Sequence, residues 1–250
     1  MPVDPAIEDR IRMCERPSGR VAMHQNWRDL LFAHWKLEPE AIQATLPPGL
    51  YVDTYDGSAW LGLVPFLMRD IRPPKLFAVP PISNFLEMNV RTYVYDEQGR
   101  PGVWFYSLDA NNPLAVFVAQ KFFHLPYLWA DMSEKRSNGN IHYSCHRKKT
   151  PADEVTEIEY SGTRELSPPE PGSFEYFLVE RYLLYTWIKK SQRLFTGRVY
   201  HTPYPVYEAE VGSMKTAVLD QAGFPMGDRS PDHVIFSPGV DVDLYSLEPA

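Results

Sequence analysis

The stretch from Gly102 to Met132 constrains the fold of this chain most strongly, because it has the pattern of a strand, an apolar helix and a second strand. Residues 103–108 alternate with a two-residue period in β-forming side chains. Asn111 or Asn112 can cap a helix that begins at Pro113, since a proline there gives up only an N–H that has no helical partner. Pro126 ends that helix, and an extended run follows.

The predicted helix, Pro113 to Leu125, has almost no polar stripe. Only Gln120, Lys121 and His124 interrupt its apolar side chains. A helix that is apolar all round is normally enclosed by the rest of its domain. We therefore expect this helix to be buried, including its large aromatic side chains Phe117 and Phe122.

The remainder of the chain predicts many short strands joined by hairpins. Turn signals at Asp56-Gly57, Gly99 and Asn138-Gly139 separate extended segments, among them 50–54, 58–71, 83–95, 140–148, 154–161, 181–188, 193–201 and 232–236. Residues 28–37 fit a strand better than a helix, and short helices are expected from Pro39, at 174–180 and at 214–221. This pattern predicts an α+β protein, mainly antiparallel β, as a single domain over 1–250 with an N-terminal arm at 1–20. The sheet is expected to curl into a barrel that encloses or flanks the buried helix.

Composition narrows the class of partner. The formal charge is −7 and the longest basic run is Arg147-Lys148-Lys149, so no nucleic-acid partner is expected. No apolar run is long enough to span a membrane and no leader precedes the domain, so a cytoplasmic protein without a membrane partner is predicted. The two cysteines, Cys14 and Cys145, fit a reducing compartment. The sequence leaves a homo-oligomer open.

The remaining residues carry no motif that indicates a cofactor or a metal. The sequence lacks a Gly-x-Ser-x-Gly elbow, a P-loop and a Gly-x-Gly-x-x-Gly motif, so no cofactor is predicted. On a strand, His142 and His146 would lie about 13 Å apart, too far for one ion, so no metal is predicted either.

The strongest candidate site is a row of polar side chains on the strand at 83–95. Glu87, Asn89 and Arg91 share one face at two-residue spacing, with Phe85 and Tyr93 at its ends. An acid, an amide and a guanidinium inside a barrel can hold a small carboxylate ligand, with Glu87 as the acid/base and Arg91 as the anchor. A buried guanidinium needs a partner, so in the ligand-free protein we expect Glu87 to pair with Arg91. The alternative is a solvated face carrying a weak ion pair.

Further candidates each have a structural alternative. Asp109, beside Ser107, could reach the same space or stabilise the turn that follows it. Arg181 and Tyr182, next to Glu180, offer donors to a ligand or a buried ion pair at a corner. His201, near Tyr204, could present a base or bond to the backbone. Lys121 could form an imine if it is buried, or extend its amine to water.

Five segments resemble the YqjF-like family of bacterial proteins of unknown function: FLEMNVRTYV, GVWFYSLDA, HLPYLWADM, FLVERYLLY and HTPYPVYEAE. The similarity spreads from about Trp27 to Val240. That family is thought to share the fold of acetoacetate decarboxylase, a curled antiparallel sheet around a ligand chamber. The resemblance therefore implies an architecture and a chamber, with no assigned reaction.

The resemblance also bears on Tyr127. In acetoacetate decarboxylase a Gly-Arg-Glu motif precedes Gly-x-Pro-Lys, whose lysine forms a Schiff base with a β-keto acid. Placing that proline on Pro126 puts Ala119, Gln120 and Lys121 at the Gly-Arg-Glu positions and Tyr127 at the lysine. Tyr127 has no primary amine and cannot form an imine. The fold is expected to be shared while the decarboxylation is not, with Tyr127 contacting the ligand instead.

Three hypotheses of function follow. The first is a chamber that binds a small organic acid and acts on it by acid/base chemistry without a Schiff-base lysine. The second is a non-catalytic binder or sensor that uses the same chamber, and the third is a structural or interaction protein. A pocket that encloses Glu87 and Arg91 would favour the first two, and a raised pKa of Glu87 would favour catalysis.

Overall fold

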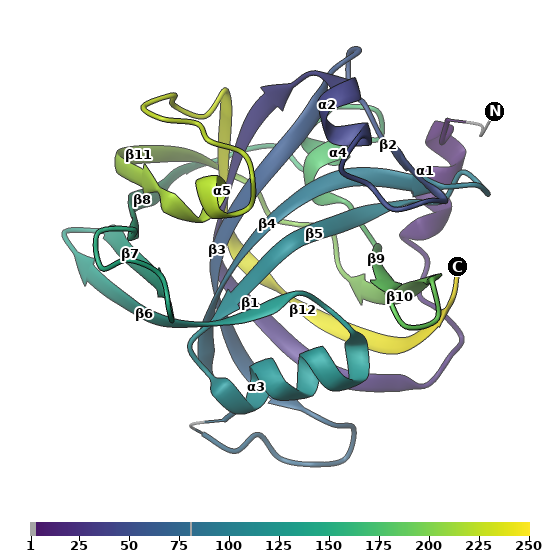
Figure 1. Cartoon of the computed structure of the whole chain (residues 1–250), viewed down its shortest axis with the longest axis horizontal. Helices are drawn as coiled ribbons and strands as arrows, with labels where there is room; N and C mark the ends of the chain where they lie inside the picture. Colours follow the sequence, from purple (N-terminus) through teal and green to yellow (C-terminus); the bar gives the residue numbers. More distant parts are fainter. Residues whose placement is uncertain (1–3, 81) are drawn as a thin grey trace.

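The computed structural model of the chain describes residues 4–80 and 82–250 (Figure 1). Within these residues one twelve-stranded sheet makes up most of the fold, and the helices are short. The strands are β1 Val21–Leu37, β2 Leu50–Val52, β3 Ala59–Arg72, β4 Phe85–Asp96, β5 Pro101–Ala110, β6 Tyr127–Ser137, β7 Asn140–Arg147, β8 Thr156–Glu165, β9 Leu183–Ile188, β10 Arg193–His201, β11 Tyr207–Thr216 and β12 His233–Pro249. The helices are α1 Ile7–Met13, α2 Pro39–Gln43, α3 Pro113–Val118, the π-helical turn η1 Ala119–Phe123, α4 Phe174–Val179 and α5 Ala217–Gln221.

The sheet closes on itself in two rings, which share β12, β1, β3, β4 and β5. One ring closes through β9 and β10, because β9 pairs with β5 and β10 pairs with β12. The other closes through β6, β7, β8 and β11. Most pairs are antiparallel, while β5 runs parallel to both β6 and β9. The predicted curled, mainly antiparallel sheet is confirmed, and its two parallel pairs make it mixed.

Each ring encloses its own hydrophobic core, and β4 forms part of the wall between them. Phe85 and Tyr93 belong to the core of the ring that contains β9 and β10. Met88 and Val90 belong to the core of the ring that contains β6, β7 and β8. Side chains alternate between the two faces of a strand, so β4 is buried along its whole length. The alternative of a solvated face for Glu87 and Arg91 is therefore wrong.

The segment after β5 forms a helix where the sequence predicts one. The Asn112 side chain accepts hydrogen bonds from the backbone N–H groups of Leu114 and Ala115, both at 3.1 Å, and Pro113 occupies the first turn. The helix widens into the π-helical turn η1 and ends at His124, which adopts a left-handed conformation with φ 51°. It joins the parallel strands β5 and β6, as the strand-helix-strand pattern requires.

The prediction that this helix is buried on all sides is wrong. Phe117 and Phe122 are 55% and 62% exposed, and only the face that carries Val116 packs fully into the core. The helix lies against the loop after β3 at one end of the molecule (Figure 1), and the Asn112 amide donates to the carbonyl of Ile82 across 3.1 Å. Apolar residues on its outer face lack any covering element among the described residues.

Other local predictions have mixed outcomes. The hairpins β4–β5, β6–β7 and β9–β10 are confirmed. The hairpin across Asp56-Gly57 is reduced to one bridge between Tyr55 and Ser58, because β2 pairs with β4 instead of β3. Strand β11 was not predicted, and it occupies part of the expected helix at 214–221. In the described residues no helix is long and apolar enough to cross a membrane.

Candidate functional site

An inner cavity of about 80 Å³ lies within the ring that contains β9 and β10. Strands β1, β3, β4 and β5 provide most of its wall, and Leu184, Val199 and Tyr204 close the far side. Glu87, Asn89 and Arg91 all line it. The structure thus brings the three predicted strand residues together on one enclosed surface, as their two-residue spacing requires.

Glu87 is buried, and the Tyr127 hydroxyl donates a hydrogen bond to its Oε2 across 2.7 Å. Burial raises the pKa of Glu87 to about 8, because the charged carboxylate loses its hydration, and the nearby charge of Asp109 acts in the same direction. The hydrogen bond from Tyr127 acts in the opposite direction. At neutral pH this carboxyl group is mostly protonated and can give up a proton inside the cavity.

Arg91 is 8% exposed, and its Nη2 donates to the Tyr93 hydroxyl at 3.3 Å and to the Leu178 carbonyl at 3.2 Å. Its guanidinium also lies 5.3 Å from the centre of the Phe32 ring. Among the described residues no carboxylate lies within ion-pairing distance of it. The predicted Glu87–Arg91 pair is therefore wrong, because Glu87 bonds to β6 while Arg91 turns towards α4.

Two buried polar atoms of the cavity lining lack a hydrogen-bond partner in the described part of the chain. They are Oδ1 of Asn89 and Nε of Arg91. Buried polar groups in folded proteins are nearly always paired, so unpaired ones in a cavity mark a place for a polar ligand or water. The inner cavity thus combines a positive charge, an unpaired acceptor and a protonated acid.

His34, a residue that sequence reasoning missed, contacts Arg91 indirectly through the Tyr93 hydroxyl. His34 Nε2 lies 2.7 Å from the Tyr93 hydroxyl, which in turn accepts from Arg91. Burial lowers the pKa of His34 well below its ordinary value, so the ring is neutral. The available signal was the position of His34 in the otherwise apolar run around Phe32, on the same face of β1.

Asp109 lies outside the cavity lining. It sits on the opposite face of β5 from Ala110 and forms a buried ion pair with Arg147, whose Nε lies 2.6 Å from Oδ1. Ser107 belongs to the same cluster, since Arg147 Nη2 donates to its hydroxyl at 2.6 Å. The prediction that Ser107 and Asp109 share the space of Glu87 is wrong, because the pairing of β5 with β4 turns them towards β7.

Arg181, Tyr182 and His201 form buried contacts beside the cavity without lining it. Arg181 Nη1 lies 2.5 Å from Asp53, so the ion-pair alternative describes it. Tyr182 donates to Glu180, and its ring stacks on His201 with 4.4 Å between centroids. His201 bonds through Nδ1 to the Thr202 carbonyl at 2.8 Å, and burial lowers its pKa to about 4.

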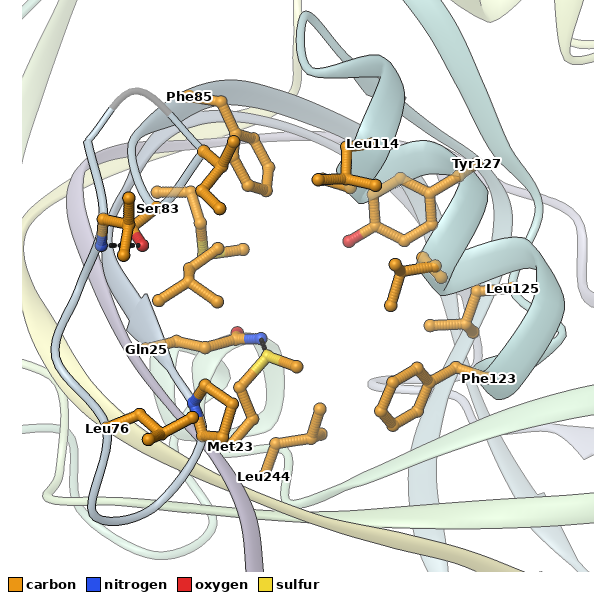
Figure 2. Close-up of a pocket in the computed structure, with 18 of the residues that line it drawn as sticks. Met23, Gln25, Leu76, Ser83, Phe85, Leu114, Phe123, Leu125, Tyr127 and Leu244 are labelled. Carbon is orange, nitrogen blue, oxygen red and sulfur yellow. Dashed lines mark hydrogen bonds between the residues drawn. The ribbon is translucent and has the colours of Figure 1, made fainter.

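A second, larger chamber of about 390 Å³ adjoins the inner cavity. Both are lined by Gln25, Met68, Leu125, Tyr127 and Leu244. Figure 2 shows side chains of the α3–η1 segment, such as Leu114 and Phe123, facing Leu76 and Met23 across an opening. The Tyr127 hydroxyl points into this opening, at the boundary between the two spaces.

Known structures share this architecture of a sheet that closes on itself. The enduracididine biosynthesis enzyme MppR complexed with pyruvate matches with a TM-score of 0.65 and 13% identity, covering 93% of this chain and 91% of its own. Acetoacetate decarboxylase from Legionella pneumophila matches with a TM-score of 0.64 and 10% identity, covering 99% of this chain and 96% of its own. These matches define the class: the protein has the acetoacetate-decarboxylase-like fold.

The family follows from sequence comparison. Residues 24–241 match DUF2071, described as an uncharacterized conserved protein. The uncharacterized protein YqjF of Bacillus subtilis (strain 168) is 36% identical over 218 residues, which is 86% of this chain and 87% of that protein. The chain belongs to the DUF2071 family, and the resemblance to YqjF-like proteins is confirmed.

Proposed function

We propose that this protein binds a small organic acid in the inner cavity and acts on it by acid/base chemistry. The observation that carries this proposal is the enclosed guanidinium of Arg91, which lacks a carboxylate partner among the described residues. A buried charge without a counter-ion is costly, and a carboxylate ligand would supply the missing negative charge. Arginine can bind such a group through two parallel hydrogen bonds.

The other polar groups of the cavity suit the same ligand. Asn89 Oδ1 is an unpaired acceptor that can take a hydrogen bond from a hydroxyl or enol of the bound acid. Proteins of this fold include MppR complexed with pyruvate and acetoacetate decarboxylase, although their low identity carries only the architecture to this chain. These likenesses support a keto acid as the first ligand to test.

Glu87 would be the catalytic acid. Its raised pKa keeps the proton on the carboxyl group at neutral pH, so Glu87 can protonate the carbonyl oxygen of the ligand while a water molecule takes a proton from the carbon beside that carbonyl, which gives the enol. The Tyr127 hydroxyl would then stabilise the carboxylate through the hydrogen bond it already donates. The raised pKa favours this role over that of a passive binder or sensor.

The chemistry would proceed without an imine. No lysine lines either chamber in the described part of the chain, and Tyr127 occupies the position matched to the decarboxylase lysine. Lys121 is exposed, with its amine over the rings of Phe117 and Phe122. The enclosed cavity also favours a ligand-binding protein over a purely structural one. The two free cysteines support a cytoplasmic location.

The test is isothermal titration calorimetry with pyruvate and acetoacetate on the wild-type protein and Arg91→Lys. Arg91→Lys should weaken binding at least about tenfold, because an ammonium cannot form the two-bond contact. Arg164→Lys is the matched control, since Arg164 is exposed and pairs with Glu208 on the surface. Equal affinity in wild type and Arg91→Lys, or no binding of either acid to the wild type, would contradict the proposal.

A second measurement separates an enzyme from a binder. Glu87→Gln keeps the shape of the side chain but cannot deliver the same proton. If the protein is a catalyst, Glu87→Gln should bind the acid but no longer exchange the α-hydrogens of its ligand with deuterium, as followed by NMR. Unchanged exchange in this variant would favour the non-catalytic binder or sensor.

A further inference from the structure

The outer chamber differs from the inner cavity in its chemistry. Its lining side chains are apolar, apart from Gln25, Ser83 and Tyr127. It is also several times larger, at about 390 Å³ against about 80 Å³. A volume of this size is typical of a pocket for a small organic molecule, whereas the inner cavity has room for only a few heavy atoms.

The three polar side chains of the outer lining already have partners. Ser83 Oγ accepts from the backbone N–H of Val79 at 2.8 Å, and Tyr127 donates to Glu87. Gln25 Oε1 accepts from Trp27 at 2.9 Å. A hydrocarbon that entered this chamber would therefore leave none of these hydrogen bonds broken. The inner cavity has the opposite character, because Arg91 and Asn89 each keep an unpaired atom.

The two spaces adjoin at Tyr127, which lines both. A ligand that reached from one to the other would place a polar end near Arg91 and an apolar end between α3–η1 and the loop after β3. The apolar lining continues outward to Leu76 and Leu114, which are 61% and 51% exposed. Hydrocarbon leaving the chamber would therefore still meet apolar surface.

We propose that the outer chamber is a binding site for the hydrocarbon tail of the ligand, so that the ligand class is a carboxylic or keto acid with an extended apolar chain. This inference rests on the proposed function, which places the acid group at Arg91. It adds a second site, which shares Tyr127 with the inner cavity and is otherwise formed by residues to which no part in the acid/base chemistry is assigned. Burial of the tail would supply affinity, while the polar end fixes the orientation of the acid.

The test is a series of straight-chain 2-oxo acids from pyruvate to 2-oxooctanoate, titrated calorimetrically into the wild-type protein. Each methylene that enters the chamber should tighten binding by about fourfold. Ala119→Trp should fill the chamber and flatten this dependence while leaving pyruvate affinity unchanged, because Ala119 lines the outer chamber and does not line the inner cavity. Phe117→Trp is the matched control, since Phe117 points outward from the same helix and is not among the lining residues.

The outcomes distinguish the two proposals. If pyruvate binds and the longer acids bind with the same affinity, the tail site is overturned and the proposed function stays intact. Failure of every acid to bind would overturn both. A chain-length dependence that persists in Ala119→Trp would place the tail on the exposed apolar rim and overturn the chamber as its site. The wild-type series needs no variant, so it tests whether affinity rises with chain length even if Ala119→Trp does not fold.

Discussion

The Tyr127 hydroxyl and the Glu87 carboxyl group lie 2.7 Å apart and join the first residue of β6 to the start of β4. Tyr127 lines both chambers, so this hydrogen bond stands where the apolar and polar spaces meet. It also opposes the effect of burial on Glu87, since it stabilises the charged carboxylate. The protonation of Glu87 is thus set by two elements that are distant in sequence.

Tyr127→Phe should raise the pKa of Glu87 above about 8, by about one pH unit, because a hydrogen bond to the charged form is lost. The measurement is a pH titration of the glutamate side-chain carbon by NMR, with Glu87→Gln used to assign the resonance. Tyr207→Phe is the control, because Tyr207 lies away from both chambers. A Glu87 pKa that falls in Tyr127→Phe would contradict the assignment of the hydroxyl as donor.

Folding stability should depend on pH through Glu87. Its pKa is about 8 in the folded protein and near 4.5 when the chain is unfolded, so between these values the folded state holds a proton that the unfolded state has lost. The stabilising contribution is complete below about pH 4.5 and decreases as pH rises, by about 1.4 kcal/mol per pH unit, until about pH 8. The free energy of urea unfolding of wild type minus that of Glu87→Gln should decline across this window. A flat difference would mean that Glu87 titrates normally.

The Asp109–Arg147 pair should contribute to stability and not to ligand binding. Asp109→Asn leaves Arg147 buried without a counter-ion and should lower the free energy of unfolding by about 3–5 kcal/mol. Replacing both residues, as in Asp109→Leu with Arg147→Met, should recover much of that loss. Pyruvate affinity of the folded variants should stay within about twofold of wild type. If a folded Asp109→Asn protein no longer binds pyruvate, Asp109 contributes to ligand binding and this prediction is wrong.

Borohydride trapping with acetoacetate or pyruvate should leave no covalent adduct, because the matched position is Tyr127 and no lysine lines the described walls of the chambers. Intact-mass spectrometry checks this, with an acetoacetate decarboxylase treated in parallel as the positive control. A mass increase on a peptide that contains Lys121 would revive the imine mechanism.

The sequence predicts the wall of the chamber well, since alternation along β4 is a local property. The two-residue period places Glu87, Asn89 and Arg91 on one face, and the structure confirms it. Their partners could not be predicted in the same way. Tyr127 reaches Glu87 through the parallel pairing of β5 with β6, and the Leu178 carbonyl reaches Arg91 from α4. These contacts depend on how the rings close, and no local pattern encodes that.

The partial exposure of the helix after β5 could not be predicted from local sequence either. Apolar composition indicates that Phe117 avoids water in most folds, but it does not distinguish a covered helix from one at the rim of a chamber. Strand β11 was missed for a different reason. Tyr207, Ala209 and Val211 alternate with Glu208 and Glu210, but the register shifts between Val211 and Met214 and breaks this period, and glutamate and glycine have low β-propensity.

Because β4 lies between two closed rings, its register decides which of its side chains face each ring. Phe85, Glu87, Asn89 and Arg91 face one ring, and Leu86, Met88 and Val90 face the other. Insertion or deletion of a single residue before Leu86 would shift every following side chain to the opposite face. The acid and the guanidinium would then enter a hydrophobic core, and aliphatic side chains would occupy the inner cavity. A change of one residue in length would therefore remove the polar site while the strand itself could still form.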